Sequence, residues 1–167
     1  MKIHIEKYNP NWITQFFKEY NQLLDSIDES DVVIEHIGST SVNGLGAKPV
    51  IDIMIGLKDF STADNHINNI ESLGYNYISK YEDIMPYRKF FIKEINEKRT
   101  HHIHMVEVDS DYWDRHIRFR DYLRSHKTVR DNYFELKISL SKKEWNDGDE
   151  YAKAKTDFIR AIETEIG

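Results

Sequence analysis

The stretch that decides the fold runs from Val33 to Ile55 and reads Val33-Ile34-Glu35-His36-Ile37-Gly38-Ser39-Thr40-Ser41, then Val42 to Ala47, then Lys48-Pro49-Val50-Ile51-Asp52-Ile53-Met54-Ile55. It predicts a strand that ends in the Gly38-Ser39 turn, then a second strand that carries one carboxylate between isoleucines. An ionised side chain in such an apolar run is costly unless it is paired, hydrogen-bonded or bound to a metal. A Gly-Ser turn that opens a helical piece offers free backbone N–H groups, which suit a phosphate. The two features together predict a site for a phosphorylated ligand and a metal.

Each of these features also has a purely structural interpretation. Asp52 is then a carboxylate near a strand end that caps a neighbouring loop. Gly38 and Ser39 are then an ordinary glycine turn with a serine helix cap. The nearby segment from Gly44 to Pro49 is not a P-loop, because proline follows Lys48 and the glycine spacing is wrong.

Length and composition are those of one globular domain over residues 1–167. The chain has 40% hydrophobic and 31% charged residues and no cysteine, which excludes disulfides, iron–sulfur clusters and cysteine zinc sites. No apolar run has the length of a membrane span and the start lacks a signal-peptide pattern, so we expect a cytoplasmic protein with no membrane partner. The net charge of −6 argues against a nucleic-acid partner.

The order of the elements predicts an α+β fold, in which one mixed sheet has helices packed on one face and a helical C-terminal part follows. Alternation over Met1–Tyr8 is typical of a short edge strand. We expect further strands over Asp31–Ile37, Val50–Leu57, Tyr75–Ser79, Tyr87–Ile95 and Thr100–Val108. We expect helices over Pro10–Ile27, Ser61–Leu73 (capped by Ser61), Asp111–His126 (capped by Asp111), Lys127–Leu140 and Asp149–Ile162.

Three histidines lie within the last predicted strand, at positions 101, 102 and 104. His102 and His104 share one face of that strand because side chains alternate. Such a pair is a candidate metal site, and imidazole suits Zn²⁺, Mn²⁺ or Ni²⁺ better than Mg²⁺. The alternative is that these histidines only hydrogen-bond phosphate or backbone, or lie at a sheet edge.

Basic residues are the candidate phosphate ligands. A stretch in an otherwise acidic chain contains Arg115, Arg118, Arg120, Arg124, Lys127 and Arg130. Its usual explanation is a solvated helix face, and the functional one is a clamp for a triphosphate or an acidic co-substrate. We assign Arg120 to the ligand site, with Arg88 before a strand and Lys48 and Lys155 as further candidates; the alternative for Lys155 is a surface lysine.

Five stretches carry a family resemblance: Glu35–Val42, Ala47–Ile53, His101–Glu107, Arg115–Arg124 and Tyr151–Ile159. They resemble the GrpB family, within the superfamily of nucleotidyltransferases that includes DNA polymerase beta and the aminoglycoside and CCA-adding enzymes. The resemblance implies a nucleotidyltransferase-type sheet, a nucleotide ligand and a divalent metal, with Asp52 as the catalytic carboxylate. In that fold the strand after the Asp52 strand often carries a further metal ligand, so the resemblance implies a metal site formed by Asp52, His102 and His104. That superfamily normally carries two carboxylates one residue apart, and Met54 stands in place of the second. Since a thioether is a poor ligand for Mg²⁺, the two-metal mechanism is lost or another group replaces the missing oxygen.

Three functions from different classes follow from these observations. The first is nucleotidyl transfer from a nucleoside triphosphate, with Mg²⁺ or Mn²⁺ as cofactor. The second is a non-catalytic protein that binds a nucleotide or another phosphorylated small molecule, which Met54 favours. The third is a phosphohydrolase that uses Zn²⁺ or Mn²⁺, which the histidines favour. The nucleobase, the acceptor and the oligomeric state have no signature in the sequence.

Overall fold

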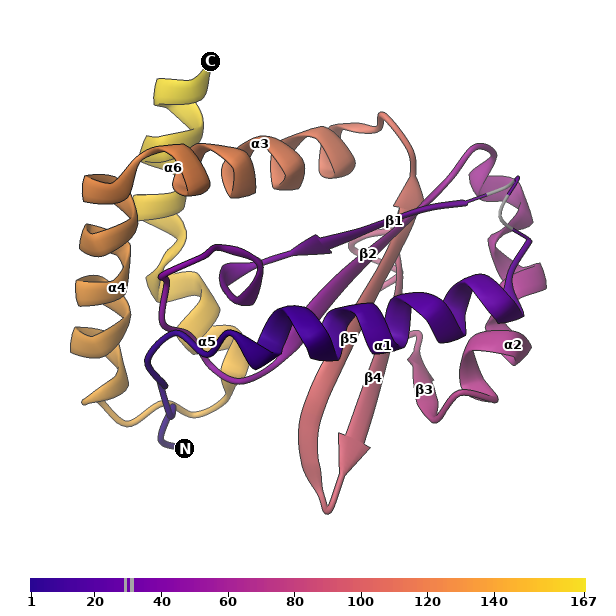
Figure 1. Cartoon of the computed structure of the whole chain (residues 1–167), viewed down its shortest axis with the longest axis horizontal. Coiled ribbons are helices and arrows are strands. Elements are labelled where there is room, and N and C mark those ends of the chain that lie inside the picture. The colour runs from indigo at the N-terminus through magenta and orange to yellow at the C-terminus, as the bar shows by residue number, and fades with distance from the viewer. Residues whose placement is uncertain (29, 31) are drawn as a thin grey trace.

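The computed structural model describes residues 1–28, 30 and 32–167. Within them, five strands form one sheet in the order β1-β2-β5-β4-β3 (Figure 1). The strands are β1 (Val32–Ile37), β2 (Ile51–Leu57), β3 (Tyr75–Ile78), β4 (Lys89–Ile95) and β5 (Lys98–Glu107). β2 and β5 are parallel, whereas the other neighbouring pairs are antiparallel. The sheet is therefore mixed, which confirms the predicted α+β class.

One face of the sheet is covered by α1 (Asn11–Ser26) and α2 (Ile67–Glu71), with α1 in front of the strands in Figure 1. Trp12, Phe16 and Leu23 recur at helical spacing along α1 and are buried. They pack on the isoleucines of β2 and on residues of β4 and β5, which form the main core. Because alternate strand residues point to opposite faces, this packing directs Asp52 to the other face.

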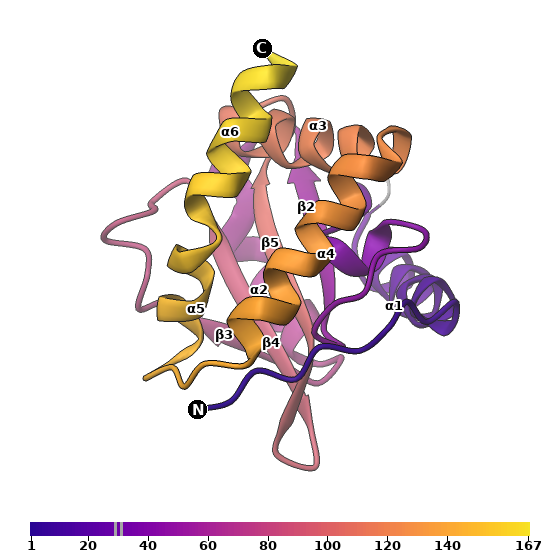
Figure 2. The same cartoon turned by 90° about the vertical axis from the view of Figure 1, so that its left-hand side faces the viewer.

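The opposite face is met by the helical C-terminal part, which stands in front of the strands in Figure 2. Its helices are α3 (Asp111–Ser125), α4 (Lys127–Ser141), α5 (Gly148–Ala154) and α6 (Thr156–Ile166). Tyr112 and Trp113 of α3 pack against Met54 in a second apolar cluster. Gly56 permits this contact, since a Cβ there would lie 2.6 Å from the Trp113 ring. A third cluster joins α3, α4 and α6 to the loop after β1.

Several predicted elements differ in the structure. The segment Met1–Tyr8 is not a strand, and its ladder contact is a single bridge between Glu6 and Ala47. The predicted helix Asp149–Ile162 is two helices, α5 and α6, which divide at Lys155. Tyr151 of α5 and Ile162 of α6 are buried in different clusters, and a single straight helix would not serve both.

Two helix caps also differ from the predictions. Asp59, not Ser61, caps the segment before α2, because the Asp59 carboxylate accepts from the Ser61 N–H at 3.0 Å. That segment is a 3₁₀-helix, η2 (Phe60–His66), followed by the short α2. Ser110 rather than Asp111 caps α3, with its hydroxyl 3.4 Å from the Trp113 nitrogen.

Asp31, the first residue of the predicted strand Asp31–Ile37, lies outside the described residues. No helix in the described part of the chain combines the length and the apolar character needed to cross a bilayer.

Candidate metal and phosphate site

The parallel pairing of β2 and β5 places Asp52 directly beside His102. Asp52 Oδ1 lies 3.6 Å from His102 Nδ1 and 3.2 Å from His104 Nε2. One potential ligand atom from each of the three side chains falls within 4.8 Å of the other two. One ion can therefore reach a carboxylate oxygen and two imidazole nitrogens, the mixed donor set that suits Mn²⁺ or Zn²⁺.

The surroundings of Asp52 favour its ionised form. Burial alone would raise its pKa, but hydrogen bonds from His102 and His104 and their positive charge lower the pKa well below its usual range. Burial lowers the pKa of His104, although the Asp52 carboxylate opposes that effect. An ionised carboxylate beside a neutral imidazole is the protonation state that metal ligation requires.

The second nitrogen of His104 decides how the ring can ligate. Its Nδ1 lies 3.2 Å from the Arg88 guanidinium and 3.2 Å from the Tyr112 hydroxyl. When Nδ1 accepts from Arg88, Nε2–H donates to Asp52. When Nδ1–H donates to the Tyr112 oxygen, Nε2 presents a lone pair for a metal. Of these two partners only Tyr112 can accept from Nδ1–H, as the ligating tautomer requires.

Met54 takes no part in the site. Its side chain is fully buried and packs with Tyr112, Trp113 and Val106. The second carboxylate position of the superfamily pattern is a core position in this chain. An Asp in its place would be buried between α3 and the sheet.

Gly38 brings the turn after β1 onto the carboxylate. Its φ of 73° and ψ of −178° belong to a region that is essentially restricted to glycine. A Cβ there would lie 2.6 Å from Asp52 Oδ2. The Ser41 hydroxyl donates to the Gly38 carbonyl at 2.5 Å and closes the turn. The turn places Ser39 beside Asp52, where both line the same cavities.

Three lysines line a cavity of about 130 Å³ that opens at Asp52. Its lining is Ser39, Thr40, Ala47, Lys48, Val50, Asp52, His102, Lys137, Tyr151 and Lys155. Lys137 and Tyr151 were not among the predicted residues. The Tyr151 hydroxyl is buried and has no hydrogen-bond partner among the described residues. This wall of amines, together with the unpartnered hydroxyl, can donate hydrogen bonds to a polyanion.

The lysines of this cavity are poorly solvated. Lys137 is 2% exposed and donates to the Gly46 carbonyl at 2.5 Å. Burial, with a contribution from the charge of Lys155, lowers the pKa of Lys137 to about 6. Burial and the charge of Lys48 lower the pKa of Lys155 to about 8. Because Lys137 and Lys155 hold their protons weakly here, an anion in the cavity would restore their charge.

A second cavity, of about 190 Å³, adjoins the first and shares Ser39, Asp52 and Lys155 with it. Its other lining residues are Gly38, Arg115, His116, Phe119, Tyr133, Ile159 and Glu163. The carboxylate therefore lies where a polar, cationic cavity meets a more apolar one.

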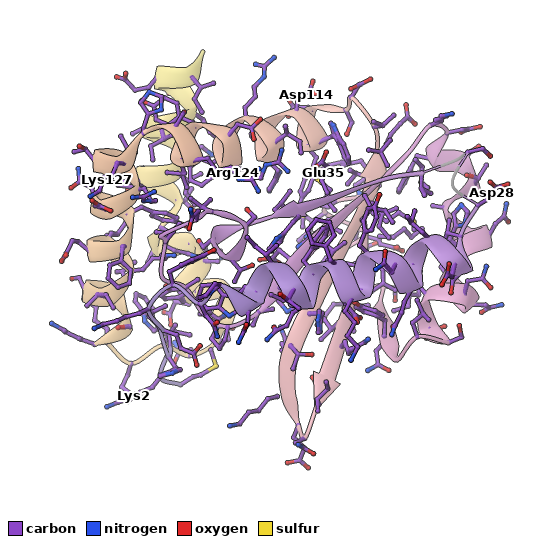
Figure 3. All side chains as sticks on the ribbon, in the orientation of Figure 1. Lys2, Asp28, Glu35, Asp114, Arg124 and Lys127 are labelled. Atoms are coloured by element: carbon purple, nitrogen blue, oxygen red, sulfur yellow. The ribbon has the colours of Figure 1, made fainter. Side chains whose placement is uncertain are left out.

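Two of the predicted arginines have other partners. Arg120 donates to Glu35 Oε2 at 2.7 Å and to the His36 carbonyl at 3.0 Å. Arg124 donates twice to the Ser41 carbonyl, at 3.0 and 2.8 Å. In Figure 3, Glu35 and Arg124 lie between β1 and α3. The structure does not bring Arg120 to the lysine cavity; Arg120 and Arg124 instead fasten α3 to β1 and to the Gly38–Ser41 turn.

The remaining predicted residues lie at or near Asp52. Gly38 and Ser39 lie against it, and Lys48 and Lys155 line the lysine cavity. Arg88 contacts His104 rather than the cavity. Lys137 had one usable sequence signal: it follows Tyr133 by four residues and precedes Leu140 by three, on the buried face of α4.

Sequence comparison identifies the family. The profile described as "GrpB protein" matches residues 2–165. The chain belongs to the GrpB family. It is 33% identical to the UPF0157 protein YqkA of Bacillus subtilis over 162 residues, which are 97% of this chain but 46% of YqkA. The crystal structure of the conserved protein GrpB from Enterococcus faecalis superposes with a TM-score of 0.87 at 34% identity, covering 98% of this chain and 96% of that one.

The fold of this GrpB chain is similar to that of a poly(U) polymerase. The crystal structure of the Cid1 poly(U) polymerase matches with a TM-score of 0.52 at 9% identity, over 81% of this chain and 41% of Cid1. At that identity the likeness concerns the fold alone. It confirms that the sheet and its helices are of nucleotidyltransferase type.

Proposed function

We propose that this GrpB protein binds a nucleoside triphosphate with a divalent metal and transfers its nucleotidyl group to an acceptor. The observation that carries the proposal is the lysine cavity that opens at Asp52, His102 and His104. Its three amines and the Ser39 hydroxyl suit the phosphate chain of the ligand. The relation of the fold to a poly(U) polymerase supports the choice of a nucleotide over other polyanions.

In this proposal the residues of the site have three roles: holding the metal, binding the phosphates and orienting His104. Asp52, His102 and His104 would hold the metal, which supplies charge neutralisation at the reacting phosphate. Lys48, Lys137 and Lys155 would bind the remaining phosphate oxygens and favour departure of the leaving group. Tyr112 and Arg88 would orient His104 from behind.

The single carboxylate favours one second candidate, a protein that binds the nucleotide without turnover. The buried Met54 leaves no second acid on β2 to hold a second metal. Nucleotide binding is common to both candidates, and product formation separates them.

Calorimetric titration tests the proposal directly. The four common nucleoside triphosphates, as non-hydrolysable analogues, are titrated in the presence of Mn²⁺, Zn²⁺ or Mg²⁺. We expect binding that requires metal, is stronger with Mn²⁺ than with Mg²⁺, and is lost in Asp52→Asn. Asp83→Asn, at an exposed loop position, is the matched control and should bind like the parent. Equal binding by parent and Asp52→Asn would overturn the proposal.

A further inference from the structure

The second cavity meets the lysine cavity at three residues, Ser39, Asp52 and Lys155. A phosphate chain in the lysine cavity would therefore present its reacting phosphorus to whatever occupies the second cavity. Phe119, Tyr133 and Ile159 give that cavity an apolar wall. The second cavity therefore offers space for an acceptor beside Asp52.

His116 of α3 also lines this second cavity, and its tautomer is set by a backbone contact. Its Nδ1 lies 2.7 Å from the carbonyl oxygen of Tyr112, one turn earlier. A carbonyl can only accept, so Nδ1 carries the hydrogen and Nε2 carries the lone pair. The ring stacks on Tyr112 with centroids 4.0 Å apart, which fixes its orientation.

The electrostatic surroundings keep this imidazole neutral. Burial lowers the pKa of His116 to about 4; the Tyr112 carbonyl opposes that shift, and His104 and Arg115 add to it. Asp52, Lys155 and Glu163 are the other charged groups that line the cavity. Nε2 of this neutral ring has no hydrogen-bond partner among the described residues. It can therefore accept a proton, and the low pKa makes it a weak base at neutral pH.

We propose that His116 is the general base that activates a hydroxyl acceptor in this cavity, an inference that rests on the proposed function. The acceptor O–H gives its proton to His116 Nε2. Its oxygen forms a bond to the α-phosphorus of the nucleotide. The bond from that phosphorus to the bridging oxygen breaks, and pyrophosphate leaves with the electron pair. The apolar wall fits a small hydroxyl compound with an apolar body, and water can replace it at a lower rate.

The chain contains its own control for this residue. His126 repeats the arrangement ten residues later, with Nδ1 2.9 Å from the Tyr122 carbonyl and its ring stacked on Tyr122 at 3.8 Å. It is exposed and lines neither cavity. His116→Asn and His126→Asn remove the same ring, from within α3 and from the residue between α3 and α4 respectively, and an Asn amide can still donate to the carbonyl.

The test measures pyrophosphate release from the triphosphate that binds best, with Mn²⁺, in water and with added 1-butanol as a hydroxyl acceptor that has an apolar body. We expect His116→Asn to lower the rate about 100-fold or more, the usual size of a general-base contribution. Its affinity for the non-hydrolysable analogue should stay within about twofold of the parent, as neutral imidazole adds little to phosphate binding. His126→Asn should match the parent, and added imidazole should restore part of the rate to His116→Ala, which a structural role would not allow.

Two results would overturn the base role and leave nucleotide binding intact. One is unchanged turnover in His116→Asn. The other is a parent protein that binds the analogue with metal but releases no pyrophosphate with water or 1-butanol. Failure of the parent to bind any triphosphate would instead overturn the proposed function, and the base role with it.

Discussion

Replacing Lys137 by methionine tests the lysine cavity through stability and binding together. Methionine keeps most of the side-chain volume but removes an amine that is buried and has a pKa of about 6 instead of 10.5. At pH 7 the folded chain must hold this amine deprotonated, which costs about 5 kcal/mol at 1.36 kcal/mol per pKa unit. The Gly46 carbonyl loses its donor, which costs about 1–3 kcal/mol. We therefore expect Lys137→Met to raise the free energy of unfolding by about 2–4 kcal/mol.

The pH dependence of this gain has a definite sign. The folded pKa lies below the unfolded one, so the parent becomes more stable as pH rises from about 6 to about 10.5. The advantage of the variant should be largest near pH 6 and disappear near pH 10. Urea denaturation at pH 6, 7 and 9.5 measures it, and Lys143→Met, at an exposed position, is the control.

Binding should change in the opposite direction. A hydrogen bond to a charged group contributes about 1.5–3 kcal/mol, so Lys137→Met should bind a triphosphate about 10- to 100-fold more weakly. Gain of stability with loss of binding is typical of a residue kept for function. A variant that unfolds at lower urea concentration than the parent, yet binds triphosphate equally well, would refute this reasoning.

Three further outcomes are expected. Gly38→Ala should lower the free energy of unfolding by about 1–3 kcal/mol and abolish metal binding, because the added Cβ meets the Asp52 carboxylate. Calorimetric titration with Mn²⁺ checks this, and normal Mn²⁺ binding would contradict the role of the Gly38 turn. Tyr112→Phe should weaken Mn²⁺ binding about 10- to 100-fold without changing the fold, because it removes the oxygen that accepts from His104 Nδ1–H. An unchanged Kd for Mn²⁺ would contradict this role of Tyr112. His36 and His116 have pKa values lowered to about 4, mainly by burial, while the unfolded chain takes up protons near 6.5. The metal-free protein should therefore lose stability as pH falls from about 6.5 to about 4, and a constant urea midpoint between pH 7 and pH 4.5 would show otherwise.

The sequence predicts those parts of the structure that depend on local patterns. Strand periodicity alone places His102 and His104 on one face, and the apolar run predicts β2 with Asp52 opposite its isoleucines. The parallel pairing that puts β5 beside β2 is a long-range contact, so the 3.2 Å approach of His104 to Asp52 needed the structure. Resemblance to a superfamily supplied the expectation that those strands are neighbours.

The rest of the site depends on how helices dock, which no local pattern specifies. Lys137 reaches the cavity because α4 packs across the end of the sheet, and its spacing from Tyr133 and Leu140 indicates only that it lies on the buried face of α4. Arg120 resembles a phosphate ligand in sequence, but Glu35, which is 85 residues away, takes its guanidinium. Met54 looks like a lost ligand until α3 is placed over it and the position becomes part of the core.

We propose that Asp52, His102 and His104 hold one metal ion at the opening of the lysine cavity. Anomalous diffraction from a crystal grown with Mn²⁺ and a non-hydrolysable triphosphate tests it most directly. We expect one strong peak about 2.0–2.3 Å from a carboxylate oxygen of Asp52 and from one nitrogen of each histidine, with phosphate density toward Lys155. A crystal with ordered triphosphate and Mn²⁺ bound elsewhere, or with both histidines still hydrogen-bonded to a metal-free Asp52, would contradict the claim.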